Sequence, residues 1–153
     1  MTIRDYRPQD TEALIRLFRG TVRQVNLGDY SSDQVAAWAP DDIDAADWAE
    51  RQARNRTLVA ELDDEIAGFA ELQDGTHAHM LYVHKDYQGR GVASALLTRI
   101  EDMARRNGAE RLTSDVSITA RPFFACRGFA VVSPQTVTLR GQEFSNFRMA
   151  KDL

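Results

Sequence analysis

The segment from His77 to Leu97, HAHMLYVHKDYQGRGVASALL, constrains the fold more than any other part of the chain. Its first part alternates apolar and polar side chains as a strand does, and its last part spaces them as a helix does. The corner QGRGVA between them carries two glycines, which leave backbone N–H groups uncovered. The free N–H groups and positive dipole end of the helix point into the same corner. The corner therefore predicts an anion site, with a phosphate or pyrophosphate as its natural occupant.

A purely structural role for this corner is the alternative. Two glycines can serve only to pack a strand tightly against the next helix, and short glycine patterns match by chance. The common nucleotide loops fit poorly, because the corner has neither the Gly-Lys-Ser/Thr of a P-loop nor the third glycine of a dinucleotide fold. Arg90 adds a guanidinium fork at the corner, which favours the anion site.

The rest of the chain divides into short strands and amphipathic helices. Strands are expected at Thr2–Tyr6, in TLVAEL and IAGFAEL around DDE, at Ala78–His84, in RLTSDVS, in FAVV with TVTL, and in EFSNFRMA. Helices are expected after Asp10, in DQVAAWA, from Ile43 to Asn55, from Val92 to Asn107-Gly108, and in ARPFFACR. This order combines hairpins with crossovers and so predicts a mixed α/β (α+β) domain. We expect one domain over residues 1–153, because no repeat or linker-like segment interrupts the pattern.

Composition narrows the class of protein. The chain has 153 residues, 43% of them hydrophobic and 27% charged, as in an ordinary globular domain. Its net charge of −4 argues against a nucleic-acid or anionic-membrane partner, because binding phosphate backbones needs a basic surface. Cys126 has no second cysteine to pair with, and MTIRDYRPQD carries charge from its start, unlike a signal peptide. We therefore expect a cytoplasmic protein, without a metal site.

Two motifs resemble those of the GNAT superfamily of acetyl-CoA-dependent N-acetyltransferases. Gln88–Ala93 matches every specified position of its acyl-CoA signature, Gln/Arg-x-x-Gly-x-Gly/Ala. SITARPFFACRGF is similar to the second cofactor segment, often Asn-x-x-Ala-x-x-Phe-Tyr-x-x-x-Gly-Phe, at Ala120, Phe123, Gly128 and Phe129. The order of elements also fits, least well over Met1–Arg56. The resemblance implies the GNAT fold: a central, mostly antiparallel twisted sheet with a splayed pair formed by the fourth and fifth strands, and flanking helices.

The resemblance also implies acetyl-CoA as cosubstrate, held mainly by backbone groups. The pantetheine arm would bind along Leu81, Tyr82 and Val83 as an added strand. The pyrophosphate would be held by Gln88, Gly89, Arg90, Gly91, Val92, Ala93 and Ser94, and the arm would be flanked by Ser117 and Phe124 in the second segment. Lys85, Arg90, Arg121 and Arg127 are equal candidates to meet the ribose phosphate.

Acetyl transfer to an amine needs a group that accepts a proton near neutral pH, and histidine, with an ordinary pKa of about 6.5, suits that task. His77 and His79 are expected to share one strand face with Leu81 and Val83, which makes His79 and His77 the predicted bases. Counted back from the QGRGVA corner, their positions in the strand are similar to those of a glutamate that acts as the base, or of paired histidines, in other members of the superfamily. Glu71 on the neighbouring strand is the reserve candidate. The alternative is that both histidines are ordinary strand residues.

The proton donor for the leaving thiolate is not at its usual place. The family often uses the tyrosine of the Phe-Tyr pair, where this sequence has Phe124. Tyr82, Tyr30, water or backbone dipoles are the alternatives. A covalent acetyl-Cys126 is less favoured because this cysteine has no assigned base. We expect direct attack by a primary amine, of a small molecule, peptide or protein, in a ternary complex; the alternative is a non-catalytic acyl-CoA-binding or sensing module.

The acceptor should be selected by the segment from Arg19 to Trp48, since this part varies with substrate in the superfamily. Tyr30, Trp38 and Trp48 either line an aromatic pocket or anchor the core. The acids of this segment, Asp41, Asp42, Asp44 and Asp47, either attract a cationic amine or stabilise helix starts, and the second interpretation is favoured. The resemblance also leaves open a homodimer formed through the terminal strands.

Overall fold

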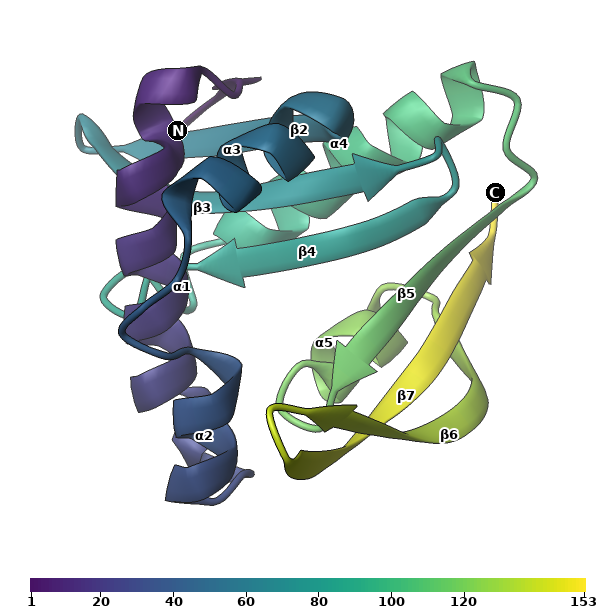
Figure 1. Ribbon diagram of the computed structural model, residues 1–153. Coiled ribbons are helices and arrows are strands. Elements are labelled where there is room, and N and C mark those ends of the chain that lie inside the picture. The colour runs from purple at the N-terminus through teal and green to yellow at the C-terminus, as the bar shows by residue number, and fades with distance from the viewer.

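A seven-stranded sheet with helices on both faces forms the protein, which the computed structural model describes over residues 1–153 (Figure 1). The strands are β1 (Thr2–Asp5), β2 (Arg56–Leu62), β3 (Glu65–Gln73), β4 (His77–Val83), β5 (Arg111–Ser117), β6 (Ala130–Leu139) and β7 (Gln142–Asp152). The helices are α1 (Thr11–Gln24), α2 (Ser32–Trp38), α3 (Ala45–Arg54), α4 (Val92–Arg106) and α5 (Arg121–Cys126), with short 3-10 turns at Pro8–Asp10 and Asn26–Gly28. None of the helices is long and apolar enough to cross a membrane.

The sheet has the order β1-β2-β3-β4-β5-β7-β6, and every neighbouring pair is antiparallel except β4 and β5. The parallel pair meets only at His77 with Thr113 and at Ala78 with Ser114. Beyond these two positions the strands diverge and leave an opening in the sheet (Figure 1). The expected mixed fold with a splayed fourth and fifth strand is confirmed.

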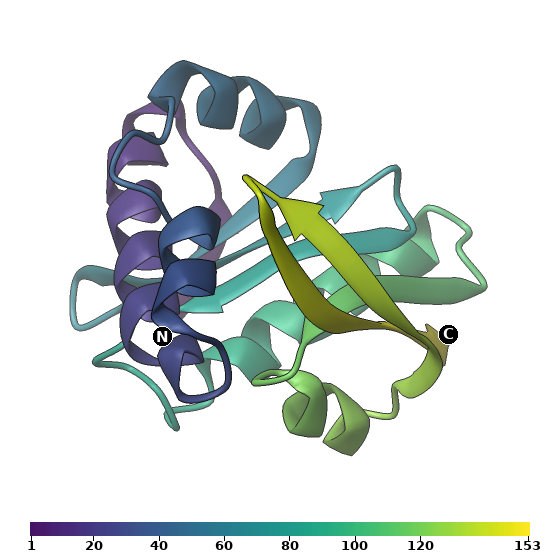
Figure 2. The same ribbon diagram turned by 60° about the horizontal axis from the view of Figure 1, so that its bottom comes forward.

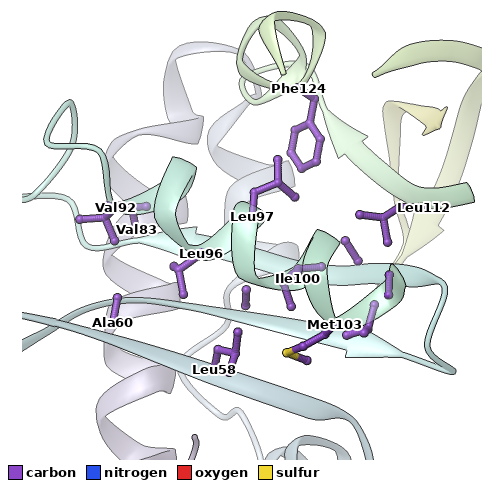
Figure 3. Close-up of a cluster of buried hydrophobic side chains, with 14 of the residues drawn as sticks. Leu58, Ala60, Val83, Val92, Leu96, Leu97, Ile100, Met103, Leu112 and Phe124 are labelled. Carbon is purple, nitrogen blue, oxygen red and sulfur yellow. The ribbon is translucent and has the colours of Figure 1, made fainter. Parts of the chain in front are cut away.

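Two hydrophobic clusters hold the helices to the two faces of the sheet. The apolar stripe of α4, which includes Leu96, Leu97 and Ile100, packs on the sheet from one side (Figure 3). On the other face, α1 and α3 pack against β3 through Phe18, Trp48 and Phe69. The start of α4 is thereby fixed beside the end of β4, where the opening begins.

Some element boundaries differ from those expected. The helix expected from Ile43 begins at Ala45, because the Asp44 side chain accepts hydrogen bonds from the N–H groups of Ala46 (2.8 Å) and Asp47 (3.3 Å) and so caps it. The strand expected around FAVV with TVTL is β6, which runs without a break through Pro134. A proline is tolerated there because β6 is the edge strand of the sheet.

Candidate active site

A cavity of about 640 Å³ fills the opening between β4 and β5. The start of α4 and the segment from Ser117 through α5 border one half of it, and α2 with the β6–β7 hairpin borders the other. Figure 2 shows this hairpin projecting toward the N-terminal helices. The volume lies within the range of about 300–1,000 Å³ that is typical of small-molecule sites. The cavity is therefore large enough to be a binding site, and it joins two chemically different halves.

The glycine corner forms one end of this cavity. Gly89 and Gly91 adopt φ values of +72° and +81°, a conformation that favours glycine, and Gly91 is the N-cap of α4. The Gln88 side-chain amide donates to the Val83 carbonyl (2.8 Å), which ties the corner to the end of β4. The lining includes Gln88, Gly89, Gly91, Val92, Ala93 and Ser94. The N–H groups of the first turn of α4 have no helical partner, so they are available to an anion at this end.

Along β4, every second residue turns its backbone N–H and C=O groups toward the opening. The His84 N–H donates to the Ala67 carbonyl of β3 (2.7 Å), and in an antiparallel pair alternate residues bond to the same neighbour. The backbone groups of Leu81 and Val83 therefore face the opening, whereas those of Tyr82 face β3. The Val83 carbonyl already accepts bonds from the Thr21 hydroxyl (2.8 Å) and from Gln88. Tyr82 borders the cavity with its side chain instead.

A β-bulge sets the position of the histidines. Leu72 pairs with Ala78 and Glu71 pairs with Met80, so His79 is an extra residue in β4. The expectation that His77 and His79 share a face with Leu81 and Val83 is therefore wrong, because the bulge interrupts the alternation. Leu81 and Val83 pack with the cluster around α4, while His79 is exposed into the cavity.

The two histidines have different surroundings. The His77 ring is half-buried, with Nδ1 2.7 Å from the Thr113 hydroxyl and Nε2 3.6 Å from Asp115 Oδ2, and it does not border the cavity. The rings of His77 and His79 lie 6.5 Å apart. Desolvation lowers the pKa of both, and Arg51 adds to the effect at His79 while Glu71 opposes it. His79 is therefore mostly neutral near pH 7, at the wall of the cavity.

Glu71 is fully buried and ion-paired. Arg51 donates from Nε to Oε1 (2.9 Å) and from Nη2 to Oε2 (2.8 Å), and the Asn55 amide donates to Oε1 (3.0 Å). Arg51 also lies 4.6 Å from the centre of the Trp48 ring. Glu71 thus binds α3 to β3 and does not border the cavity.

The second predicted cofactor segment borders the corner half of the cavity. The Ser117 hydroxyl accepts a bond from the Ala120 N–H (3.1 Å), which shapes the turn into α5. Phe124 is buried, with its ring centre 5.1 Å from that of Phe129, and Figure 3 shows it beside Leu97 of α4. Phe124 and Ser117 both line the cavity.

The four cationic candidates for the ribose phosphate each have a neighbour already. Lys85 lies 3.5 Å from Asp86, Arg90 lies 3.6 Å from Asp63, Arg121 stacks 4.4 Å from the Phe147 ring centre, and Arg127 donates to the Thr98 hydroxyl (2.8 Å). Arg127 is further held by buried Glu101 at 3.8 Å. Arg127 is thus the most firmly held of the four, and the other three are exposed.

The aromatic residues of the N-terminal half divide between cavity and core. Tyr30 and Trp38 line the cavity, and the Tyr30 hydroxyl donates to the Ser145 carbonyl (2.8 Å) while accepting from the Ile118 N–H (2.9 Å). Trp48 is a core residue, 5.1 Å from the Phe18 ring centre. The acids of this segment serve the fold, since Asp44 caps α3 and Asp41 pairs with Arg23 (2.6 Å).

Sequence reasoning missed seven cavity residues that come from β5 and the terminal hairpin. They are Ser114, Asp115, Val116, Val137, Leu139, Phe144 and Asn146. The inward orientation of the hairpin residues follows from the register of β6 with β7 and from the position of the hairpin over the opening. Alternation along a strand predicts which residues share a face, but it does not predict that this face meets a cavity.

Comparisons with known proteins agree with this geometry. The acetyltransferase (GNAT) domain family matches residues 26–152. The uncharacterized N-acetyltransferase YafP of Escherichia coli K12 is 38% identical over 147 residues, which span 96% of this chain and 93% of YafP. A GCN5-related N-acetyltransferase from Rhodopseudomonas palustris is 38% identical, with a TM-score of 0.97 over 99% of this chain and 95% of that one. The PaiA N-acetyltransferase from Thermoplasma acidophilum, solved with coenzyme A, shares the fold at 20% identity, with a TM-score of 0.80 over 99% and 98% of the two chains. The chain therefore belongs to the GNAT acetyltransferase family.

Proposed function

We propose that this protein transfers the acetyl group of acetyl-CoA to a primary amine, which attacks directly while both substrates are bound. The observation that carries the proposal is the continuity of one cavity from the glycine corner to His79. A base and an anion site on a shared cavity wall can place an amine beside an activated acyl group. Membership in the acetyltransferase family and the coenzyme A complex of PaiA support the choice of cosubstrate.

The corner half fits acetyl-CoA in its chemistry. The backbone N–H groups from Gly89 to Ser94 would hold the pyrophosphate, since the first turn of a helix favours anions. The opening-facing backbone groups of Leu81 and the N–H of Val83 would bind the pantetheine arm as an added strand, since the Val83 carbonyl already accepts two bonds. Ser117 and Phe124 would flank the arm from the other side of the cavity. When bound, acetyl-CoA supplies an acyl thioester.

His79 acts as the general base in this proposal. The bulge turns its side chain to the cavity, and its lowered pKa keeps the imidazole unprotonated and ready to accept a proton from the amine. His77, bonded to Thr113 and outside the cavity, acts as a support for the start of β4. Glu71 joins the neighbouring strand β3 to α3 through Arg51.

Phe124 has no proton to give to the leaving thiolate. The Tyr30 hydroxyl already donates to a backbone carbonyl. Tyr82 also borders the cavity, but burial raises its pKa and so makes its hydroxyl a weaker acid than an ordinary tyrosine. Proton delivery thus falls to water before Tyr82, and a thiolate is a tolerable leaving group without a dedicated acid.

The test compares His79→Ala with the matched variant His77→Ala. Loss of the base should lower kcat/KM for thiol release by about 10²–10⁴-fold in His79→Ala, while His77→Ala retains most activity. Stabilisation of the fold by CoA, measured by thermal shift, should be unchanged in His79→Ala because the corner is intact.

The pH profile provides a second readout. The base form of His79 is lost as the pH falls through its folded pKa, which lies below the usual value of about 6.5. The wild-type kcat/KM should therefore decrease as the pH falls below the folded pKa of His79, and the pH profile of His79→Ala should lack this acidic decrease. The same acidic decrease in His79→Ala would contradict the assignment of the base. Absence of any thermal shift with CoA or acetyl-CoA would contradict the proposed cosubstrate.

A further inference from the structure

The half of the cavity beyond His79 has a distinctive lining. We infer that it accepts a hydrophobic primary amine that carries no carboxylate, an inference that rests on the proposed function and specifies its acceptor. Three observations carry it: the apolar inner face of the β6–β7 hairpin, the aromatic wall that adjoins it, and the single carboxylate on the lining.

The β6–β7 hairpin presents apolar side chains to the cavity. Val137 pairs with Phe144 across the hairpin, so the two lie on the same face, and Leu139 follows Val137 on that face. All three line the cavity. Val137 is 42% exposed and Leu139 is 37% exposed, so this face keeps apolar surface open toward the cavity. Apolar surface left open inside a binding site favours a ligand that covers it.

An aromatic wall adjoins the hairpin and packs on its Phe144. Trp38 packs edge-to-face on Tyr30, with ring centres 5.3 Å apart, and on Phe144 at 6.0 Å. Hydrogen bonds hold this wall to the hairpin: Arg140 Nη1 donates to the Ala37 carbonyl (2.6 Å), and the Gln34 amide donates to the Glu143 carbonyl (2.6 Å). These bonds join α2 to the hairpin beside the apolar half, which suits a hydrophobic body.

Asp115 is the charged side chain on the cavity lining, and the histidine there, His79, is mostly neutral. Asp115 accepts bonds from Arg148 Nε (2.7 Å) and from the Gln135 amide (2.9 Å). Burial alone would raise the pKa of Asp115, but these bonds outweigh it and hold the pKa below its usual value. An ammonium group entering the site meets this ionised carboxylate. A ligand carboxylate would instead lose its water beside apolar walls and face Asp115, whose cationic partner is already engaged.

The experiment uses three amines that share one phenyl body. They are 2-phenylethylamine, phenylalaninamide and phenylalanine, and of these only the last carries a carboxylate. With acetyl-CoA and the protein, kcat/KM for thiol release should be at least about tenfold higher for the first two than for phenylalanine, because the lining holds no cation that could pair with the carboxylate. Ethanolamine should react more slowly than 2-phenylethylamine, because it covers no apolar surface.

A charge placed on the hairpin tests the location. Val137→Lys offers a carboxylate partner within the cavity and should narrow the preference for phenylalaninamide over phenylalanine by several-fold. Thr136→Lys makes a comparable change on the opposite face of the same strand and should leave the preference unchanged. Leu139→Lys is the second variant should Val137→Lys fold poorly, as judged by its melting temperature.

The outcomes separate this inference from the proposed function. Equal rates with phenylalanine and phenylalaninamide would overturn the inference, and so would a preference that Val137→Lys and Leu139→Lys leave untouched. Thiol release with ethanolamine or spermidine but not with the phenyl amines would overturn the hydrophobic acceptor while leaving the acetyltransferase standing. No thiol release with any of these amines would count against the proposed function and this inference together.

Discussion

Gly68 of β3 lies where helix α4 approaches the sheet, and replacing it with alanine should weaken both the fold and the cofactor corner. A Cβ at this position would lie 2.9 Å from the Tyr82 carbonyl oxygen, 2.9 Å from Val92 Cγ1 and 3.1 Å from Leu96 Cδ1. The carbonyl belongs to the β3–β4 pairing and cannot move alone. Relief therefore requires the β3–β4 pairing to distort at this point and α4 to shift away from the sheet.

The size of the effect follows from two opposing contributions. Overpacking costs about 1–3 kcal/mol, and replacing glycine in the unfolded chain returns about 0.4–1 kcal/mol, so the net loss should be roughly 1–2 kcal/mol. For a chain of this length, that corresponds to a fall in melting temperature of roughly 2–8 °C. Because Val92 begins α4, the affinity for CoA should fall as well.

The assay is thermal and urea unfolding of Gly68→Ala beside Gly20→Ala. A Cβ at Gly20, inside α1, would lie 3.7 Å from Lys85 Cδ, an ordinary contact. Alanine should therefore stabilise that helix by about 0.5–1 kcal/mol. The two substitutions should shift the melting temperature in opposite directions. A melting temperature of Gly68→Ala at or above that of the wild type would refute the packing argument.

Two further substitutions test the corner and the buried ion pair. Gly91→Ala forces a side chain into φ +81° at the N-cap of α4, which should lower the free energy of unfolding by about 1–2 kcal/mol. It should also weaken CoA binding in a titration. The control Gly28→Ala, with no atom within 4 Å of its Cβ, should leave binding unchanged. Arg51→Met leaves the Glu71 carboxylate buried without its cation and should lower the free energy of unfolding by about 3–5 kcal/mol in urea; a loss below 1 kcal/mol would show that Glu71 finds another partner.

Local patterns predicted much of the fold. The apolar spacing of α4, the glycines that bound it and the hairpins of the sheet are encoded within short stretches, and they placed the corner correctly at the end of β4. The resemblance over Gln88–Ala93 then predicted the splayed strands. The break between β4 and β5, which forms the cavity, has no local signature, since it depends on how few residues of the two strands pair.

The site was less predictable where it depends on tertiary packing. Strict alternation placed His79 on the face of Leu81, and the extra residue of the bulge overrode it. Glu71 was the reserve candidate for the base because of its place on the neighbouring strand. In the structure, Arg51, twenty residues earlier in the chain, donates hydrogen bonds to both of its carboxylate oxygens. Trp38 and Trp48 had the same two interpretations in the sequence, and only the packing of α2 and α3 separates the cavity residue from the core residue.

The bulge at His79 divides β4 into two segments with different neighbours. From Met80 onward, the strand is fixed by its pairing with β3 and by its connection to the corner. Before the bulge, His77 and Ala78 pair with β5 as well as with β3. An added residue at this joint absorbs a change of spacing without turning the following side chains over. The chain can therefore remodel the end of β4 near the acceptor while the end that serves the cofactor keeps its register.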